Sequence, residues 1–335
     1  MKNKVKIIAE AGLNHNGDFK KLIKLIDIAK KANADFVKFQ LFKTKNFINK
    51  KFSHKKVDYE KVYKRFQSLE FSFGEWKKAI QYGNKIGIRV FFSIFDKESL
   101  EFLKKLKINL VKIPSGEINN YDLLKSINRS KIKVILSTGM SNLNEIKKAL
   151  GYLKNCEVIL LHCVSEYPTI NPNLNNIKLL KIKFKKETGY SDHTPDTLIP
   201  AFSVLAGAKY VEKHFTYNKN QKIGDHKFSL NPKELKLMVE NIKLAESSMG
   251  LKIKTITKKE KNLQFFARKG LYLNNDKIKG EKIKYSDLSI LRPEGFLSVD
   301  KLNLIINKKL RKNIKSYTPL KISHFRIHRW KEILY

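Results

Sequence analysis

Cysteine is scarce in this sequence, which contains only Cys156 and Cys163 among 335 residues. Both fall in one apolar stretch, and they form neither a Cys-x-x-Cys pair nor the disulfide framework of a secreted protein. Long apolar runs are missing too, since no segment reaches the roughly 18 uninterrupted apolar residues of a membrane helix and residues 1–4 do not open a signal sequence. We therefore expect buried free thiols and a soluble, cytoplasmic protein.

Acidic residues are also few, because 31 Asp and Glu stand against 69 Lys and Arg, a formal net charge of +38. Such an excess would ordinarily point to a nucleic acid or another anionic partner. Nearly all of it is Lys, however, whereas phosphate and base readers draw heavily on Arg, and no helix-turn-helix, zinc-finger or aromatic RNA-binding motif occurs. We interpret the charge as a solvated surface that can steer anionic substrates, and we expect neither nucleic acid nor membrane as partner.

Short apolar runs alternate with amphipathic stretches as far as about residue 214, which is typical of repeated βα units in an α/β protein. Eight such units predict a closed (β/α)8 TIM barrel. The predicted strands are residues 5–9, 36–40, 88–93, 110–113, 134–137, 158–163, 188–191 and 210–214.

Helix signals and a long loop accompany these strands. Ser72 and Glu75 have the spacing of a capping box, and Asn231 and Pro232 open an amphipathic helix that runs to about residue 250. The polar stretch 41–71, which follows the second strand, is either a functional loop over the barrel mouth or a disordered insertion.

A domain boundary is predicted after residue 250. Residues 1–250 form the catalytic barrel domain, the Lys-rich segment 251–262 is a solvated linker, and residues 263–335 form a small β-rich module with a strand at 270–273. The length and the 42% hydrophobic content fit one large and one small domain.

Polar residues recur where the predicted strands end, and in a βα barrel these positions face the active-site mouth. The strand ends supply Glu10, Lys38, Gln40, Ser93, Lys112, Ser115, Glu117, Thr138, His162, Ser165, Tyr167, Ser191, His193 and His214. One such residue alone is often structural, but their recurrence at equivalent positions indicates a site.

His193 and His214 end neighbouring strands, where both imidazoles can bind one divalent cation. Two ligands leave coordination positions open, which suits Mn²⁺ or Mg²⁺ acting as a Lewis acid on a carbonyl oxygen. The alternative is a pair of hydrogen-bonded core histidines. We interpret His15 as a turn residue within the sequence NHNG rather than as a further ligand.

Lys38 and Lys112 end two strands near each other, and fixed cations there suit a small dianion such as phosphoenolpyruvate. Hydroxyls of Ser93, Ser115 and Ser191 would bond its phosphate and carboxylate, unless each forms a local backbone hydrogen bond instead.

Two carboxylates, Glu10 and Glu117, lie within this cationic mouth. In one interpretation, one of these carboxylates transfers protons or holds a water molecule as charge develops on the reacting substrate. In the other, the carboxylates form structural salt bridges to Lys38 or Lys112.

These residues belong to motifs that resemble those of bacterial N-acetylneuraminate (sialic acid) synthases. The motifs are IAEAGLNHNG at 8–17, VKFQ at 37–40, KIPSGE at 112–117, STGM at 137–140, LHC at 161–163, YPT at 167–169, SDHT at 191–194 and EKHFT at 212–216. The C-terminal module is similar to the family's antifreeze-like (SAF) domain, including Gly280-Glu281 and Arg292-Pro293. The likeness covers essentially the whole chain in the family's order.

The resemblance implies a transferase that joins the enol carbon of phosphoenolpyruvate to the open-chain aldehyde of N-acetylmannosamine. Water addition at C2 and carbon–oxygen cleavage then release N-acetylneuraminate and phosphate. It further implies that His193 and His214 hold a metal that polarises the aldehyde, and Glu117 matches a carboxylate placed near the metal-bound water. We predict Glu10, Glu117, His193 and His214 as the catalytic residues.

The resemblance also assigns the binding residues. Phosphoenolpyruvate would be held by Lys38, Ser93, Lys112, Ser115, Ser165 and Ser191, and the sugar by Gln40, Tyr167, Asp225 and Arg292. In the family, an arginine of the small domain reaches into the neighbouring subunit's barrel and contacts the acetamido group of the sugar. With Arg292 in that place, a domain-swapped homodimer is expected.

Several departures from the family pattern concern the sugar more than the reaction. The chain reads FSIF at 92–95 in place of Ser-Thr-Pro-Phe, IGDH at 223–226 in place of Gly-Pro-Asp-His, and Ser165 where some members carry Asn. The loop 46–68 offers no residue that matches a sugar contact. One alternative is a legionaminate or pseudaminate synthase, which uses a diacetamido dideoxy sugar. A remoter alternative is a non-catalytic basic binding protein on a barrel scaffold.

Overall fold

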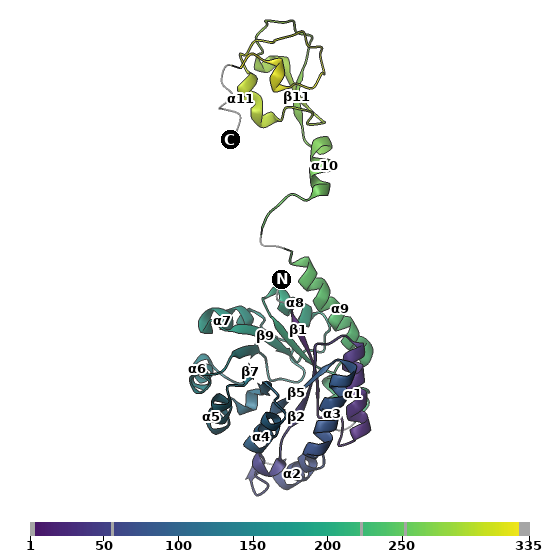
Figure 1. The fold of residues 1–335 in the computed structure, drawn as a ribbon, viewed down its shortest axis with the longest axis vertical. Helices are drawn as coiled ribbons and strands as arrows, with labels where there is room; N and C mark the ends of the chain where they lie inside the picture. The colour runs from purple at the N-terminus through teal and green to yellow at the C-terminus, as the bar shows by residue number, and fades with distance from the viewer. Residues whose placement is uncertain (1–3, 55–56, 222–223, 251–252, 328–335) are drawn as a thin grey trace. The chain divides into compact units, whose positions relative to one another are not determined.

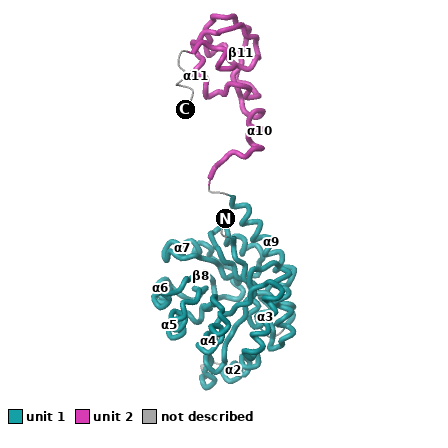
Figure 2. Tube along the Cα trace, viewed as in Figure 1, with its two compact units in different colours: residues 1–250 teal, residues 251–335 magenta. Residues whose placement is uncertain are grey.

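The computed structural model describes residues 4–54, 57–221, 224–250 and 253–327. The chain divides into unit 1, Met1–Gly250, and unit 2, Leu251–Tyr335 (Figure 2). Each unit has a hydrophobic core of its own. Among the described residues, we find no helix with the length and hydropathy of a membrane span.

Unit 1 is a TIM barrel whose eight parallel strands close in the order β1-β10-β9-β8-β7-β6-β5-β2 (Figure 1). The strands are β1 (Lys6–Gly12), β2 (Phe36–Leu41), β5 (Arg89–Ile94), β6 (Leu110–Ile113), β7 (Lys133–Ser137), β8 (Val158–His162), β9 (Glu187–Asp192) and β10 (Tyr210–His214). All eight predicted strands are confirmed. β1 runs three residues beyond its predicted end at residue 9, through a register shift between Glu10 and Gly12 that the residue pattern does not reveal.

Helices surround the barrel, and side-chain caps start several of them. They are α1 (Phe19–Lys31), α3 (Phe73–Ile86), α4 (Lys97–Lys105), α5 (Tyr121–Ser130), α6 (Leu143–Tyr152), α7 (Asn175–Phe184), α8 (Ile199–Leu205) and α9 (Pro232–Ser248). The predicted capping box of Ser72 and Glu75 has both of its hydrogen bonds. The helix predicted at Asn231 is α9, and Asn231 caps it in the same way.

An apolar layer fills the middle of the barrel. It consists of Ile8, Phe36, Phe91, Leu110, Ile135, Ile159, Leu161 and Tyr210, and it is separate from the larger core between strands and helices. Because this layer is buried, the two ends of the barrel carry two separate polar surfaces. The C-terminal strand ends form one of them, and polar residues at or just before the strand starts, such as Lys6, Asp35 and Arg89, form the other.

The stretch 41–71 is folded rather than a disordered insertion throughout its described residues. It contains the 3-10 turn η1 (Thr44–Asn46), the two-residue strands β3 (Ser53–His54) and β4 (Val57–Asp58), and α2 (Tyr59–Gln67). The Phe42 ring packs against Phe47, Phe66 and Phe95 at centroid distances of 5.0, 5.6 and 6.0 Å. Its base is fixed by Glu70, which accepts a hydrogen bond from the Thr44 backbone at 2.7 Å.

Unit 2 contains α10 (Lys258–Ala267), β11 (Gly270–Leu273), β12 (Leu288–Leu291), α11 (Leu302–Ile305) and the 3-10 turns η4 (Tyr285–Asp287), η5 (Val299–Lys301) and η6 (Ile322–His324). The strand predicted at 270–273 is confirmed and pairs antiparallel with β12. The segment 251–262, predicted as a linker, differs because α10 begins within it. The cause is a capping box of Thr257 and Glu260 inside a Lys-rich stretch that composition alone marks as solvated.

Candidate active site

A cavity of about 350 Å³ opens at the C-terminal ends of the barrel strands. It is lined by Glu10, Lys38, Gln40, Ser93, Lys112, Pro114, Ser115, Gly116, Ser137, Met140, Cys163, Ser165, Tyr167, Ser191, His193, Glu212, His214 and Asp225. Of the fourteen residues that were assigned a catalytic, metal-binding, phosphoenolpyruvate-binding or sugar-binding role, all but Glu117 and Arg292 line this cavity, which therefore brings twelve together. They come from every strand of the barrel or the loop that follows it except β7, which contributes only Ser137 and, in its loop, Met140 to the lining.

Two buried lysines and two buried glutamates share the cavity floor. Lys38 Nζ lies 2.8 Å from Glu10 Oε2 and 3.6 Å from Glu212 Oε2, and Lys112 Nζ lies 2.7 Å from Glu212 Oε1. Lys38 also donates to Ser93 Oγ at 2.7 Å. Glu10 thus forms a salt bridge to Lys38, which is one of the two roles that the sequence left open for this residue. Buried charges require such pairing, because an unpaired one would cost several kcal/mol.

The two carboxyls of this cluster differ in proton affinity. Burial raises the pKa of Glu10 to about 7, although Lys38 opposes the change. Burial acts in the same direction on Glu212, but Lys112 and Lys38 outweigh it and hold the pKa of Glu212 at about 2. Glu212 is therefore the permanent anion between the lysines, and Glu10 is the carboxyl that can exchange a proton near neutral pH.

Glu212 is the site residue that the sequence did not single out. On β10, successive side chains face opposite sides, so that Glu212 and His214 both face the cavity whereas Lys213 faces away. Lys213 instead forms a buried ion pair with Asp192 at 2.5 Å. The signal was present, because Glu212 lies two residues before a histidine already predicted to face the barrel mouth.

Close backbone approach at Gly139 builds one wall of the cavity. The Gly139 backbone N–H donates to Ser115 Oγ at 3.1 Å, and Ser115 Oγ lies 3.1 Å from Cys163 Sγ. A Cβ on Gly139 would overlap Ser115 Oγ, Cys163 Sγ and Ser165 Oγ, so a larger residue here would have to displace these side chains. The resulting cluster of hydroxyls and a backbone N–H suits the oxygens of an anionic group.

The two predicted metal-binding histidines face one another, with ring centroids 5.9 Å apart. His193 Nδ1 lies 2.6 Å from the Val164 carbonyl oxygen and must donate to it, which leaves the lone pair on Nε2. That lone pair accepts from the Tyr167 hydroxyl at 3.0 Å. His214 Nδ1 is buried without a hydrogen-bond partner, 3.7 Å from Asp225 Oδ2. His193 is thus oriented as metal ligands are, by a backbone carbonyl behind the ring.

Both imidazoles are neutral at physiological pH. Burial, helped by His214, lowers the pKa of His193 to about 4, and burial, helped by Lys38, lowers the pKa of His214 to about 3. A neutral ring is the form that binds a metal. No group of three or more His, Cys, Asp or Glu side chains within the described residues is arranged to hold a metal ion, so the candidate metal site has two imidazoles alone.

A second set of polar groups converges around Gly12. A Cβ at this position would lie 3.4 Å from Glu10 Oε1, 3.5 Å from Asp225 Oδ2 and 3.6 Å from Gln40 Nε2. Gly12 has φ of +53°, which a glycine adopts without strain. Burial raises the pKa of Asp225, and the positive charge of Arg65 on α2 opposes that change. The loop in which no sugar contact was found therefore carries a cation that acts on the cavity.

Five predicted or considered residues lie outside the lining of this cavity. Thr138 donates to the Leu161 carbonyl oxygen at 2.9 Å, and His162 Nε2 lies 2.8 Å from the Pro172 carbonyl oxygen. Glu117 ends the turn η2 (Ser115–Glu117), is half-buried, and accepts a hydrogen bond from Asn120 Nδ2 at 2.8 Å. Arg292 is an exposed residue of unit 2. His15 is fully buried against Phe71, with ring centroids 4.8 Å apart, which agrees with its interpretation as a structural residue.

The chain is similar in sequence and structure to several known proteins. Residues 25–254 match the model of the NeuB family. The N,N'-diacetyllegionaminic acid synthase of Campylobacter jejuni is 41% identical over 93% of this chain and 97% of its own length, and a pseudaminic acid synthase of C. jejuni is 36% identical over 96% and 97%. The crystal structure of N-acetylneuraminic acid (sialic acid) synthetase from Leptospira borgpetersenii in complex with citrate is 33% identical, with a TM-score of 0.71 over 78% of this chain and 90% of that one.

Proposed function

The chain belongs to the NeuB family, and on that premise we propose that it is a nonulosonate synthase, a transferase that condenses phosphoenolpyruvate with N-acetylmannosamine to give N-acetylneuraminate and phosphate. The observation that carries the proposal is the pair of lysines buried in the floor of a cavity whose walls also hold two neutral imidazoles. A cavity of about 350 Å³ is in the size range of small-molecule sites.

Phosphoenolpyruvate is proposed to bind where the cations and hydroxyls gather. Lys38 and Lys112 supply fixed positive charge, which offsets the negative charge of the ligand. Ser93, Ser115, Ser165 and Ser191 supply the hydrogen bonds. The Gly139 N–H donates to Ser115 Oγ and so holds that hydroxyl in the same wall.

A divalent cation, Mn²⁺ or Mg²⁺, would be held by His193 and His214. The fit is supported by the lone pair of His193 Nε2, which a cation would take over from the Tyr167 hydroxyl, and by the buried Nδ1 of His214, which has no hydrogen-bond partner. When bound, such an ion would polarise the aldehyde oxygen of the sugar. Asp225, 3.7 Å from His214, adds negative charge that favours a cation there.

The chain's own acid–base groups are proposed to be Glu10 and Glu117. Glu10 has a pKa of about 7, so it holds or releases a proton under working conditions, and it lies beside the lysines. Burial also raises the pKa of Glu117, which shares a turn with Ser115 and is proposed to act from the edge of the cavity.

The sugar is proposed to bind on the side of Gln40, Tyr167 and Asp225. A second candidate sugar is a diacetamido dideoxy hexose, as used by legionaminate or pseudaminate synthases. It is favoured by the 41% identity with an N,N'-diacetyllegionaminic acid synthase. Arg65, an exposed cation whose charge acts on Asp225, is a candidate for contacting the second acetamido group.

Unit 2 is proposed to be an antifreeze-like (SAF) domain that exchanges between the two subunits of a homodimer. The proposal is supported by its separate core and by the exposed guanidinium of Arg292. In the dimer, Arg292 would complete the sugar site of the neighbouring barrel.

The proposed function is tested by phosphate release from phosphoenolpyruvate with Mn²⁺ and a panel of sugars. N-acetylmannosamine and the diacetamido sugars that legionaminate and pseudaminate synthases use are the arms, with N-acetylglucosamine as the control sugar. We expect sugar-dependent phosphate release and a nine-carbon sugar acid as product. Phosphate release that no sugar stimulates would contradict the proposal.

A further inference from the structure

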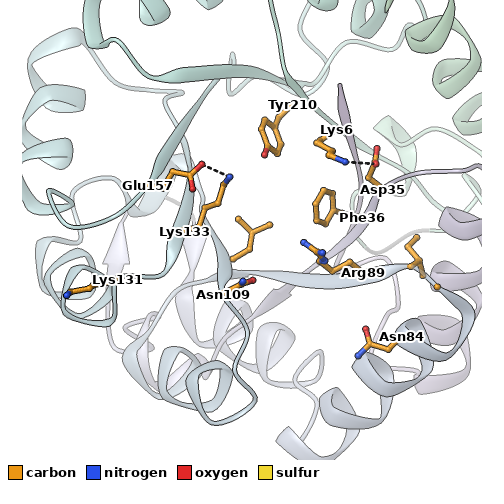
Figure 3. A pocket seen from close by; sticks show the side chains of 13 residues that line it. Lys6, Asp35, Phe36, Asn84, Arg89, Asn109, Lys131, Lys133, Glu157 and Tyr210 are labelled. Carbon is orange, nitrogen blue, oxygen red and sulfur yellow. Dashed lines mark hydrogen bonds and ion pairs between the residues drawn. The ribbon is translucent and has the colours of Figure 1, made fainter. Parts of the chain in front are cut away.

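A second and larger hollow lies at the opposite end of the barrel, where the strands begin. It has a volume of about 830 Å³, and we call it the N-terminal cup. It is lined by Lys6, Asp35, Phe36, Asn84, Gly87, Ile88, Arg89, Asn109, Leu110, Lys131, Lys133, Glu157 and Tyr210 (Figure 3). None of these residues lines the candidate active site. The cup is therefore a separate feature of the molecule.

The cup has an apolar floor and a polar wall for a simple geometric reason. Its floor is the part of the buried barrel layer nearest the strand starts. This part consists of Phe36, Leu110 and Tyr210, the first residues of β2, β6 and β10. Arg89 and Lys133 are the first residues of β5 and β7, and they extend from the barrel instead of packing inside it. In Figure 3, the side chains of Phe36, Arg89, Lys133 and Tyr210 surround a common space.

Carboxylates neutralise only part of the positive charge in the cup. Lys6 Nζ lies 3.4 Å from Asp35 Oδ1, and Lys133 Nζ lies 2.5 Å from Glu157 Oε1. Four cations and two carboxylates line the hollow, which leaves two positive charges in excess.

The two remaining cations are Arg89 and Lys131, and neither pairs with a carboxylate in the described part of the chain. The Arg89 guanidinium carbon lies 5.4 Å from the centroid of the Phe36 ring. This cation–π contact holds one face of the guanidinium and leaves its N–H edges available. Such an edge forms bidentate hydrogen bonds with carboxylates and phosphates.

We propose that the N-terminal cup binds a small organic oxyanion, a phosphate ester or a carboxylate. Its anionic group bonds to Arg89 among the surrounding lysines, and its apolar part lies on Phe36 and Tyr210. A concave site with an apolar floor and a few convergent polar groups is the usual form of a small-molecule site. The proposal goes beyond the proposed function, because no residue of the cup takes part in it.

The experiment measures binding of two probes, pyrophosphate and citrate, by titration calorimetry at low ionic strength. The proteins are the wild type, Arg89→Gln and the matched control Lys85→Gln, which removes the same charge from an exposed residue of α3 outside the cup. The active site also attracts anions, but it is the same in all three proteins. A difference between their isotherms therefore comes from the substituted position.

We expect Arg89→Gln to weaken binding of at least one probe by about tenfold, the effect of one charge-assisted hydrogen bond, while Lys85→Gln binds like the wild type. If Arg89→Gln weakens the binding of pyrophosphate, the natural ligand carries a phosphate group. If it weakens the binding of citrate, the natural ligand carries a carboxylate. Equal isotherms for the wild type and Arg89→Gln would overturn the proposal. An equal loss in Lys85→Gln would also overturn it, since general charge attraction would then explain the binding. An unchanged melting temperature of Arg89→Gln establishes that it is folded.

Discussion

Lys112 Nζ lies 2.7 Å from Glu212 Oε1 in the floor of the cavity, although 100 residues separate the two in sequence. Both side chains are only 4% exposed. Glu212 Oε1 also accepts from Ser191 Oγ at 3.0 Å. One carboxylate thus fixes the position of a lysine and of a hydroxyl, and both are proposed to hold phosphoenolpyruvate.

Glu212→Gln is expected to reduce the free energy of unfolding by about 3–5 kcal/mol, because Lys112 then remains buried without its anion. Urea denaturation measures the effect. The control is Glu240→Gln, which removes an exposed carboxylate 4.0 Å from Lys236 and should change stability by less than about 1 kcal/mol. Similar values for the two variants would show that Glu212 does not stabilise the cluster.

His193→Gln is expected to abolish the stimulation of turnover by Mn²⁺ and to lower turnover on the order of 100-fold, while the melting temperature changes little. Phosphate release with and without chelator measures it. The control is His162→Gln, at the end of the preceding strand, whose ring contacts the Pro172 carbonyl oxygen at 2.8 Å instead of lining the cavity. A metal response in His193→Gln equal to that of the wild type would refute the metal assignment.

Arg292→Ala is expected to raise KM for the sugar by about tenfold or more and to leave KM for phosphoenolpyruvate nearly unchanged. The reason is that its guanidinium is proposed to contact only the acetamido group. Steady-state kinetics with each substrate varied in turn provide the measurement. Arg311→Ala, another exposed arginine of unit 2, is the matched control. Equal increases in both KM values would argue against a role on the sugar side.

Stability is expected to fall with decreasing pH because of His15. Its ring is fully buried, and burial, followed by the charge of His226, lowers its pKa to about 3. Between pH 6.5 and about 3 the unfolded chain takes up a proton that the folded chain does not. The contribution of His15 to the free energy of unfolding is therefore at its full value above pH 6.5, and it decreases by about 1.4 kcal/mol per pH unit below that pH.

His15→Phe should make the dependence of the unfolding free energy on pH shallower between pH 4 and 6 by that amount. The loss of the hydrogen bond from the Gly17 backbone to His15 Nδ1, 3.1 Å in length, adds only an offset that does not vary with pH. Urea midpoints at several pH values measure the slope. Parallel curves for the two proteins would contradict the role assigned to His15.

Local residue patterns were enough to predict the barrel and most of its site. Strand signals such as VKFQ place Lys38 and Gln40 on the same face, because side chains alternate along a strand, and barrel closure brings every strand end to one rim. The same patterns placed His193 and His214 side by side. They did not place Glu117, since the direction of a side chain in a short turn depends on its neighbours, here Asn120.

The sequence by itself therefore determined most of the residues that reach the C-terminal rim of the barrel. Only the tertiary structure decided how those residues share charge and hydrogen bonds. Residues from different strands or loops meet in three places. These are the pairing of Lys112 with Glu212, the contact of Tyr167 with His193, and the N-terminal cup. The physical reason is that periodicity fixes the side of a strand on which a residue lies, whereas its partners across the barrel are set by closure and register.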